Sequence, residues 1–261
     1  MENLVNMSER YNQYLNDIKG TWLYRFTWNG LNNKLPQNSI SIVNFIKETD
    51  IFSNVKFPNN AKGFFNLIKK SLVNKYIDWC LTKNHYNEAE QEDLRNFFVG
   101  CMGEYFFYVF LKEVKTILIK NEYTQYLEQY FFNNVCPRFA DDSDYGVDLT
   151  GTVDHNNDSY NVVFQVKFWD PVWNTKQISY GIVSNVFTDA ILNNYIDLKH
   201  VNIFVCWLGD VNKVSKYLKA NKMLYQRIKF IDKDVLEKTI NNKLPTFWNI
   251  LHNELINIKN F

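Results

Sequence analysis

Two runs of alternating apolar and polar residues constrain the fold of this chain more than any other feature. Val147, Leu149 and Val153 share one face of the run 147–154, and the run 161–169 alternates in the same way. Alternation with period two indicates a β-strand with one buried face. The segment DHNNDS between the runs contains Asn, which tolerates the left-handed backbone of a tight turn. The sequence therefore predicts a β-hairpin.

The predicted hairpin brings an acid next to a Gln-x-Lys triplet. If the turn centres on Asn156 and Asn157, Asp148 lies opposite Gln165, and opposed residues on one face have Cβ atoms about 4.5–5.5 Å apart. Lys167 shares the face of Gln165, so the three side chains converge. A turn with an odd number of residues would shift this register.

This cluster has the composition of a metal-assisted phosphodiesterase site. A carboxylate and an amide oxygen are hard ligands that suit Mg²⁺, with Mn²⁺ as a substitute. Such a metal acts as a Lewis acid on phosphoryl oxygens and lowers the pKa of bound water. A Lys beside it can orient the attacking water or stabilise charge on a phosphate, whereas a structural ion would only be repelled by a neighbouring cation.

One acidic residue, Glu104, interrupts the apolar segment FFVGCMGEYFFYVFL over 97–111. The segment is shorter than the roughly 20 residues of a membrane span, so we expect a buried helix and no membrane association. A buried carboxylate without a partner is costly. Glu104 therefore either points into a polar site or forms a salt bridge to a core Lys or Arg.

The order of these features resembles the PD-(D/E)XK nuclease superfamily. A helix with Glu104 is followed by GVDLTG with Asp148 and by FQVKFW with Gln165 and Lys167. The pattern resembles the variant in which Gln replaces the second acid, as in Mrr-like restriction endonucleases. The resemblance extends over roughly 95–240, and there IKFIDKDVLEKTI is similar to the closing strand and helix of those domains. It implies an α/β, restriction-endonuclease-like core with a mixed sheet flanked by helices, preceded by a helical N-terminal region.

The resemblance also assigns roles to individual residues. It implies metal binding by Asp148, by the Gln165 side chain and by the backbone carbonyl of Val166. Lys167 would activate the water, and Glu104 would be a direct or water-mediated metal ligand. The chain departs from the family pattern because a Gly-Val pair precedes the Asp and the second acid is an amide. A neutral amide attracts a cation less strongly, so we expect weak metal binding without DNA.

Simpler interpretations of several residues stay open. The Gln-x-Lys triplet is also typical of an exposed, polar sheet face. In the segment ADDSDYG, the acids Asp141, Asp142 and Asp144 are either additional metal ligands or a solvated acidic loop.

Lysines in two segments are candidates for contacting DNA phosphates. Lys213, Lys216, Lys219 and Lys222 recur at every third position, and on a helix they would spread over about half the circumference. Lys176 follows the predicted site strand. A solvated helical face explains the first four equally well.

The spacing of apolar residues changes along the chain. We expect a helical region over 1–90, acting as a DNA clamp or a dimer surface, and a nuclease domain over 91–261. The pattern is mostly helical to about residue 130, and shorter strand-like runs follow from about residue 135. The expected helices cover 2–18, 61–81, 90–114 and 176–197.

Bulk properties restrict the partners and the compartment. The net charge of +1 gives no general attraction to nucleic acid, so DNA binding would need a local basic surface. The four cysteines show no C-x-x-C spacing, which favours reduced, buried thiols and a cytoplasmic protein. The N-terminal sequence does not have the pattern of a signal peptide.

These observations together predict a Mg²⁺-dependent endonuclease that cleaves double-stranded DNA as a homodimer, either a type II restriction enzyme or a related phage-defence nuclease. Two alternatives are a structure- or modification-dependent nuclease, including one acting on RNA, and a non-catalytic DNA-binding protein that retains the fold.

Overall fold

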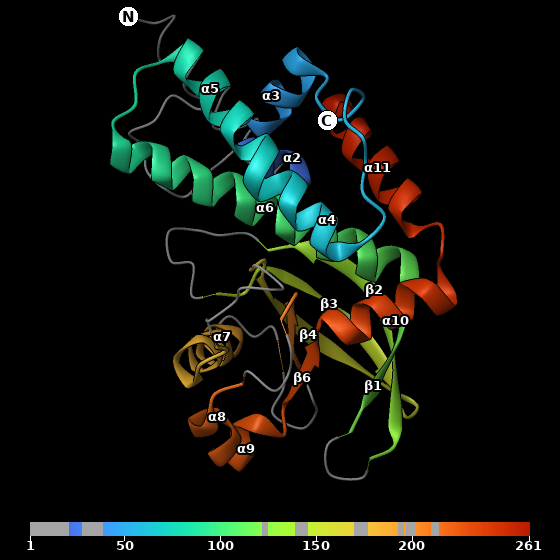
Figure 1. Cartoon of the computed structure of the whole chain (residues 1–261). Helices are drawn as coiled ribbons and strands as arrows, with labels where there is room; N and C mark the ends of the chain where they lie inside the picture. The colour runs from blue at the N-terminus through green and yellow to red at the C-terminus, as the bar shows by residue number, and fades with distance from the viewer. Residues whose placement is uncertain are drawn as a thin grey trace, which may run out of the picture.

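A six-stranded mixed sheet lies between two groups of helices (Figure 1). The computed structural model describes residues 21–27, 39–121, 125–138, 146–169, 177–192, 196, 202–209 and 214–261. The strands occur in sheet order as β1 (Thr116–Lys120), β2 (Leu127–Pro137), β3 (Leu149–His155), β4 (Asp158–Lys167), β5 (Ile203–Trp207) and β6 (Ile228–Ile231). β1 to β4 pair antiparallel, whereas β4, β5 and β6 pair parallel. The mixed α/β architecture predicted from the sequence is confirmed.

Helices precede the sheet, connect its parallel strands and follow it. The described helical elements are α2 (Trp22–Thr27), α3 (Ile42–Thr49), α4 (Ala61–Asn66), the π-helix η2 (Leu67–Leu72), α5 (Val73–Lys83), α6 (Glu88–Val114), α7 (Tyr180–Leu192), α8 (Lys216–Ala220), α9 (Lys222–Tyr225), α10 (Lys233–Lys243), α11 (Phe247–Asn257) and the 3-10 helix η4 (Ile258–Asn260).

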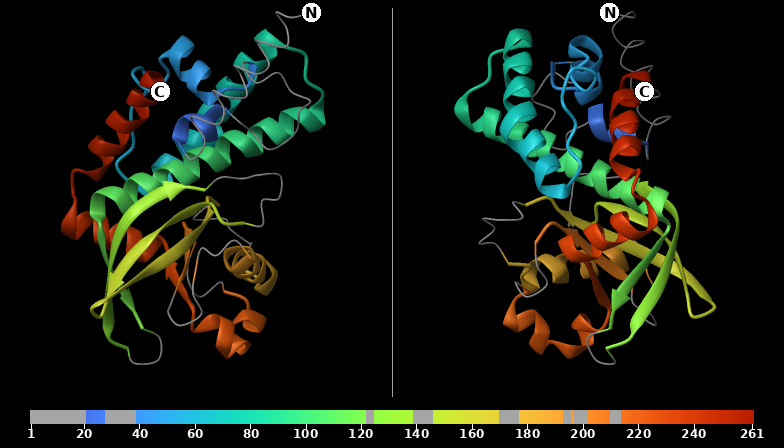
Figure 2. Two further views of the ribbon diagram at one scale, coloured as in Figure 1. Left: turned by 180° about the vertical axis from the view of Figure 1, so that it is seen from behind. Right: turned by 45° about the vertical axis from the view of Figure 1, so that its right-hand side comes forward.

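Each face of the sheet carries its own hydrophobic cluster. One face packs against α6, α10 and the remaining helices of the N- and C-terminal layers, and its cluster includes Leu149, Phe164 and Phe168. The other face packs against α7, α8 and α9, and its cluster includes Val163. Figure 2 shows these two helical groups from behind and after a turn of 45°. The first cluster continues across the domain boundary expected near residue 90, since α4, α5 and α6 all contribute to it.

The predicted hairpin is confirmed, including its register. Asn156 and Asn157 form the turn with φ of 51° and 70°, and Leu149 pairs with Phe164 as the turn position requires. Val147 is the exception, because the prediction placed it on the face of Leu149. It lies in the opposite cluster, since β3 begins at Leu149 and Gly146 (φ 103°) turns the chain just before it.

The structure corrects the helical prediction for residues up to about 130. α6 ends at Val114, because its C-cap residue Lys115 has a φ of 56° that breaks the helix. β1 and the first half of β2 follow as an antiparallel pair. Their alternation is visible in the buried side chains of Ile117 and Ile119. A five-residue run is too short to be distinguished from a helix by periodicity alone.

Two further expectations need correction. The lysine segment is not one helix but the two short helices α8 and α9, because Ser215 and Asn221 each cap a new start. Of the four thiols, Cys136 is exposed rather than buried. The helix expected over 176–197 is α7, with narrower bounds.

Other expectations concern the N-terminal half of the chain. The buried helix expected over 97–111 is confirmed within α6. Among the described residues, no helix is long and apolar enough to cross a membrane. The helix expected over 2–18 lies outside the described residues.

Candidate active site

Asp148 lies where β2, β3 and β4 meet, and its main chain is held on both sides. Its N–H donates to the Phe164 carbonyl at 2.9 Å, and its carbonyl accepts the Arg138 N–H at 3.0 Å. Two residues beyond the Leu149–Phe164 pair, an unbroken ladder would place Val147 opposite Val166. The chain turns away at that point, which leaves the Val166 N–H for a side chain.

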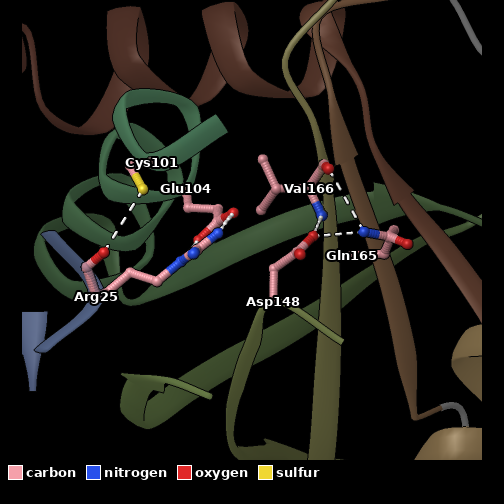
Figure 3. Close-up of polar contacts among 6 residues, drawn as sticks. All are labelled: Arg25, Cys101, Glu104, Asp148, Gln165 and Val166. Atoms are coloured by element: carbon pink, nitrogen blue, oxygen red, sulfur yellow. Dashed lines mark hydrogen bonds and ion pairs between the residues drawn. The ribbon is translucent and has the colours of Figure 1, made fainter. Parts of the chain in front are cut away.

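The Asp148 carboxylate takes that position. Its Oδ2 accepts the Val166 N–H at 2.5 Å and also a hydrogen bond from Gln165 Nε2 (Figure 3). Gln165 is almost fully buried at 2% exposure, so its amide needs polar partners. The predicted convergence of Asp148 and Gln165 is confirmed. The Asp148 carboxylate is held in place by the Gln165 amide and by the Val166 N–H, where the β3–β4 pairing ends.

Gln165 presents its amide nitrogen to Asp148 and its oxygen to Gly146. A Cβ built on Gly146 would lie 2.7 Å from Gln165 Oε1, so only glycine leaves room for this orientation. Rotation of the amide by half a turn would exchange the two atoms and direct Oε1 toward Asp148. Val166 carries the third predicted oxygen, its backbone carbonyl, which Gln165 Nε2 approaches to 3.5 Å.

Glu104 reaches the site from α6, but Arg25 of α2 binds it. Arg25 Nε donates to Glu104 Oε2 at 2.7 Å, and Nη2 donates to Oε1 at 2.6 Å. This bidentate pair is the strongest geometry available to a carboxylate and a guanidinium. Of the two interpretations of Glu104, the salt bridge to a core Arg is therefore the one present, and it lies beside Asp148 (Figure 3).

Electrostatic coupling links the two acidic side chains. Burial alone would lower the pKa of Arg25, but the negatively charged carboxylates of Glu104 and Asp148 raise it well above its ordinary value. Burial raises the pKa of the Cys101 thiol to about 12, and Glu104 and Asp148 reinforce that shift. Arg25 therefore compensates one of the two negative charges that Glu104 and Asp148 bring to the site.

A glycine allows α6 to come this close to the sheet. A Cβ on Gly103 would lie 2.4 Å from Cβ of Phe168, just past the end of β4. The backbone of α6 therefore lies directly against the chain at this point. This places the next residue, Glu104, near the C-terminal end of β4.

Lys167 is half-buried at the end of β4. Its register partner on the neighbouring parallel strand is Trp207. The structure gives Lys167 no ion pair with any residue in the described ranges, Asp148 included. Among the described residues, the charge of Lys167 is therefore left without an ion-pair partner.

The remaining predicted residues fall into two groups. Lys216, Lys219 and Lys222 are exposed on α8 and α9, on the sheet face opposite Glu104. Lys176, Lys213 and the acids of ADDSDYG lie outside the described residues.

Arg25 is the site residue that the sequence did not identify. It is the only charge in the aromatic segment TWLYRFTWNG, just as Glu104 is the only charge in its own apolar segment. Two such isolated opposite charges are a signal for pairing, but 79 positions separate them.

The oxygen atoms at this site fit a hard cation rather than zinc. Asp148, the Val166 carbonyl and the Gln165 amide supply hard oxygens, and Mg²⁺ needs only a few of these because it retains several waters. Within the described ranges, no group of three or more His, Cys, Asp or Glu side chains is placed to hold a metal. A cation here would therefore rest mainly on Asp148 while Arg25 holds Glu104.

Comparison with known proteins adds no assignment: no family model, no curated protein and no solved structure matches the chain.

Proposed function

We propose that this chain is a Mg²⁺-dependent endonuclease with a PD-(D/E)XK-like core that hydrolyses double-stranded DNA, in the class of type II restriction or related phage-defence enzymes. The observation that carries the proposal is the Asp148 carboxylate held against Gln165 and Val166 on the strand that ends in Lys167. The element order supports it, since α6 with Glu104, the β3–β4 hairpin, α7 and the parallel strand β5 occur in the order of the resemblance, with β1 and β2 between α6 and the hairpin.

Each residue has a distinct role in this proposal. Asp148, the Val166 carbonyl and, after rotation of its amide, Gln165 would hold the ion, with Glu104 contributing through water. Bound Mg²⁺ supplies Lewis-acid chemistry at a phosphoryl oxygen and a more acidic bound water. Lys167, which has no ion pair among the described residues, would orient the attacking water and stabilise negative charge on the phosphate.

DNA would also contact a surface away from this site. Exposed Lys216, Lys219 and Lys222 can bind phosphates, and Tyr217, which is 84% exposed, can stack on a base. We also propose a homodimer, because cutting both strands of a duplex calls for two sites.

The test is cleavage of plasmid and phage DNA in Mg²⁺ by the full chain and its Lys167→Ala variant. We expect the variant to cleave at least about 100-fold more slowly, the usual effect of removing a group that acts on the transferred proton or charge. Lys112→Ala, an exposed change on α6 outside both the candidate site and residues 1–90, is the matched control and should cleave at the parent rate. Equal cleavage by Lys167→Ala and the parent would remove the mechanism. Methylated plasmid, single strands and RNA as substrates separate the structure- or modification-dependent alternatives.

One observation favours the second candidate, a non-catalytic DNA-binding protein. Arg25 already engages both oxygens of Glu104, as a residue that replaces a metal would. This candidate predicts that the parent chain shifts DNA in a gel but cleaves neither DNA nor RNA with Mg²⁺ or Mn²⁺.

A further inference from the structure

A second candidate site lies at the other end of the hairpin, between the two outer strands of the sheet. A cavity of about 940 Å³ opens there, lined by β1, β2, β6, α10 and the α8–α9 segment. His155, at the turn end of β3, is part of its wall. His155 lies seven positions after Asp148 along the hairpin, which is roughly 23 Å at about 3.3 Å per residue. The cavity is therefore separate from the candidate active site.

The cavity wraps around the free edges of the sheet. Leu118 and Ile119 point to opposite faces of β1 and both line it, and on β6 the same holds for Ile228 and Lys229. Cα atoms of β1 and β6 approach within 8 Å of each other. A peptide strand inserted between them would need about 9.4–9.8 Å, two strand spacings. Where the two strands come this close, the gap is too narrow for an added strand, which favours a small molecule as the ligand.

The charge of the lining favours an anion. Five lysines and three carboxylates line the cavity, an excess of two positive charges. Glu128 is compensated internally, because Lys229 Nζ and the Tyr130 hydroxyl each donate to its Oε2 at 2.6 Å. By contrast, no residue of the described ranges forms an ion pair with Lys120 or Lys238.

Lys219 of α8 also lines the cavity, and no residue of the described ranges forms an ion pair with it. A concave surface with one predominant sign of charge concentrates the field and attracts the opposite sign.

The lining also offers groups that suit a polar ring. Leu118 and Leu127 are 39% and 64% exposed, which leaves apolar surface for one face of a flat group. Side-chain amides of Asn242 and Gln226 line the same cavity and can both donate and accept hydrogen bonds. The volume falls in the range of about 300–1,000 Å³ typical of small-ligand sites and far exceeds that of a bare phosphate.

From the lysines, the amides and the exposed leucines, we propose that this cavity binds a nucleoside phosphate, with the phosphates on Lys120 and Lys238 and the base near Leu118 and Leu127. The proposal does not depend on nuclease activity, because its tests measure binding alone.

Calorimetric titration of the full chain with ATP tests the proposal. We expect saturable binding, weakened roughly tenfold or more by Lys120→Glu or Lys238→Glu, since each loses a charge-assisted contact and adds repulsion. Lys62→Glu, an exposed reversal on α4, should bind as the parent does. No heat of binding up to about 1 mM ATP, or an equal loss in Lys62→Glu, would overturn the site.

Three further measurements identify the ligand class and its place. Labelling with 8-azido-ATP should modify peptides of β1, β2, β6 or α10, and labelling only elsewhere would refute the location. Tripolyphosphate binding as tightly as ATP would exclude recognition of the nucleoside. Displacement of ATP by a short DNA duplex, with the same dependence on Lys120 and Lys238, would assign the lysines to nucleic-acid phosphates instead of a free nucleotide.

Discussion

The two ends of the β3–β4 hairpin differ in whether their charged side chains have partners within the protein. At the Asp148 end, the protein compensates its own acids, since Arg25 binds Glu104 and backbone and amide groups bind Asp148. At the turn end, Lys229 compensates Glu128, whereas the exposed lysines of the cavity have no ion pair within the described ranges.

Depth in the structure explains the difference. The Glu104 side chain is only 7% exposed, and an uncompensated charge at that depth costs several kcal/mol. A lysine on an exposed rim stays hydrated and costs little. The buried end of the hairpin, at Asp148 and Glu104 (the deep end), therefore suits a small cation that fits among oxygen atoms. The exposed end, at the cavity lysines, suits an anion that binds from solvent. The following predictions test this contrast, from the largest effect to the smallest.

The largest effect should come from removing the acid at the deep end. We expect Glu104→Ala to lower the free energy of unfolding by about 3–5 kcal/mol, because Arg25 is left without its partner in a largely buried position. Glu92→Ala, on the same helix and paired with Arg95 at the exposed surface, should cost less than about 0.5 kcal/mol. Urea unfolding followed by circular dichroism measures both.

An equal loss of unfolding free energy in Glu104→Ala and Glu92→Ala would show that the Glu104–Arg25 pair is no more buried than a surface pair. A double replacement of Arg25 and Glu104 by Met should recover most of the stability, because packed apolar side chains can replace a buried ion pair.

The next effect concerns how α6 approaches the deep end. Gly103→Ala should destabilise the protein by about 1–3 kcal/mol, since the new Cβ would overlap Phe168. Gly100→Ala, one turn earlier in the same helix, meets nothing closer than Glu104 Oε1 at 3.9 Å. It should stabilise the helix by about 0.5–1 kcal/mol. Thermal and urea unfolding of the two variants should therefore move in opposite directions, and a shared direction would contradict the close approach.

The smallest effect lies at the cavity end and depends on pH. Burial would raise the pKa of Glu128, but hydrogen bonds from Lys229, Tyr130 and Asn121 outweigh it and lower the pKa to about 2. A pKa below the ordinary 4.5 means that the stabilisation is present above about pH 4.5 and is lost as the pH falls toward about 2.

We expect Glu128→Gln to remove about 1–2 kcal/mol of stability at pH 6, a figure reduced for the partial exposure of the carboxylate. The difference from the parent should shrink between pH 5 and pH 3 in urea unfolding. A constant difference over that range would show that the Glu128–Lys229 pair does not set the acid dependence.

The hairpin shows what local pattern can predict. Alternation fixed which residues face the core, the Asn pair fixed the turn, and the two together placed Asp148 beside Gln165. The same reasoning failed at Val147. The chain turns at Gly146 and regular alternation begins only with β3 at Leu149, so Val147 lies on the opposite face of the sheet from Leu149. It also missed β1, whose five residues carry too short a pattern.

By itself, the sequence determined the hairpin, its register and the isolated charge at Glu104, because these depend on neighbours a few positions apart. Only the tertiary structure decided that Arg25 binds Glu104, and that β1 and β6 approach closely enough to enclose a cavity. The physical reason is that a buried charge is paired by whichever segment packs against it, and the distance between the two edge strands of an open sheet depends on the summed twist of all six strands. Neither property is encoded in any short stretch of the chain.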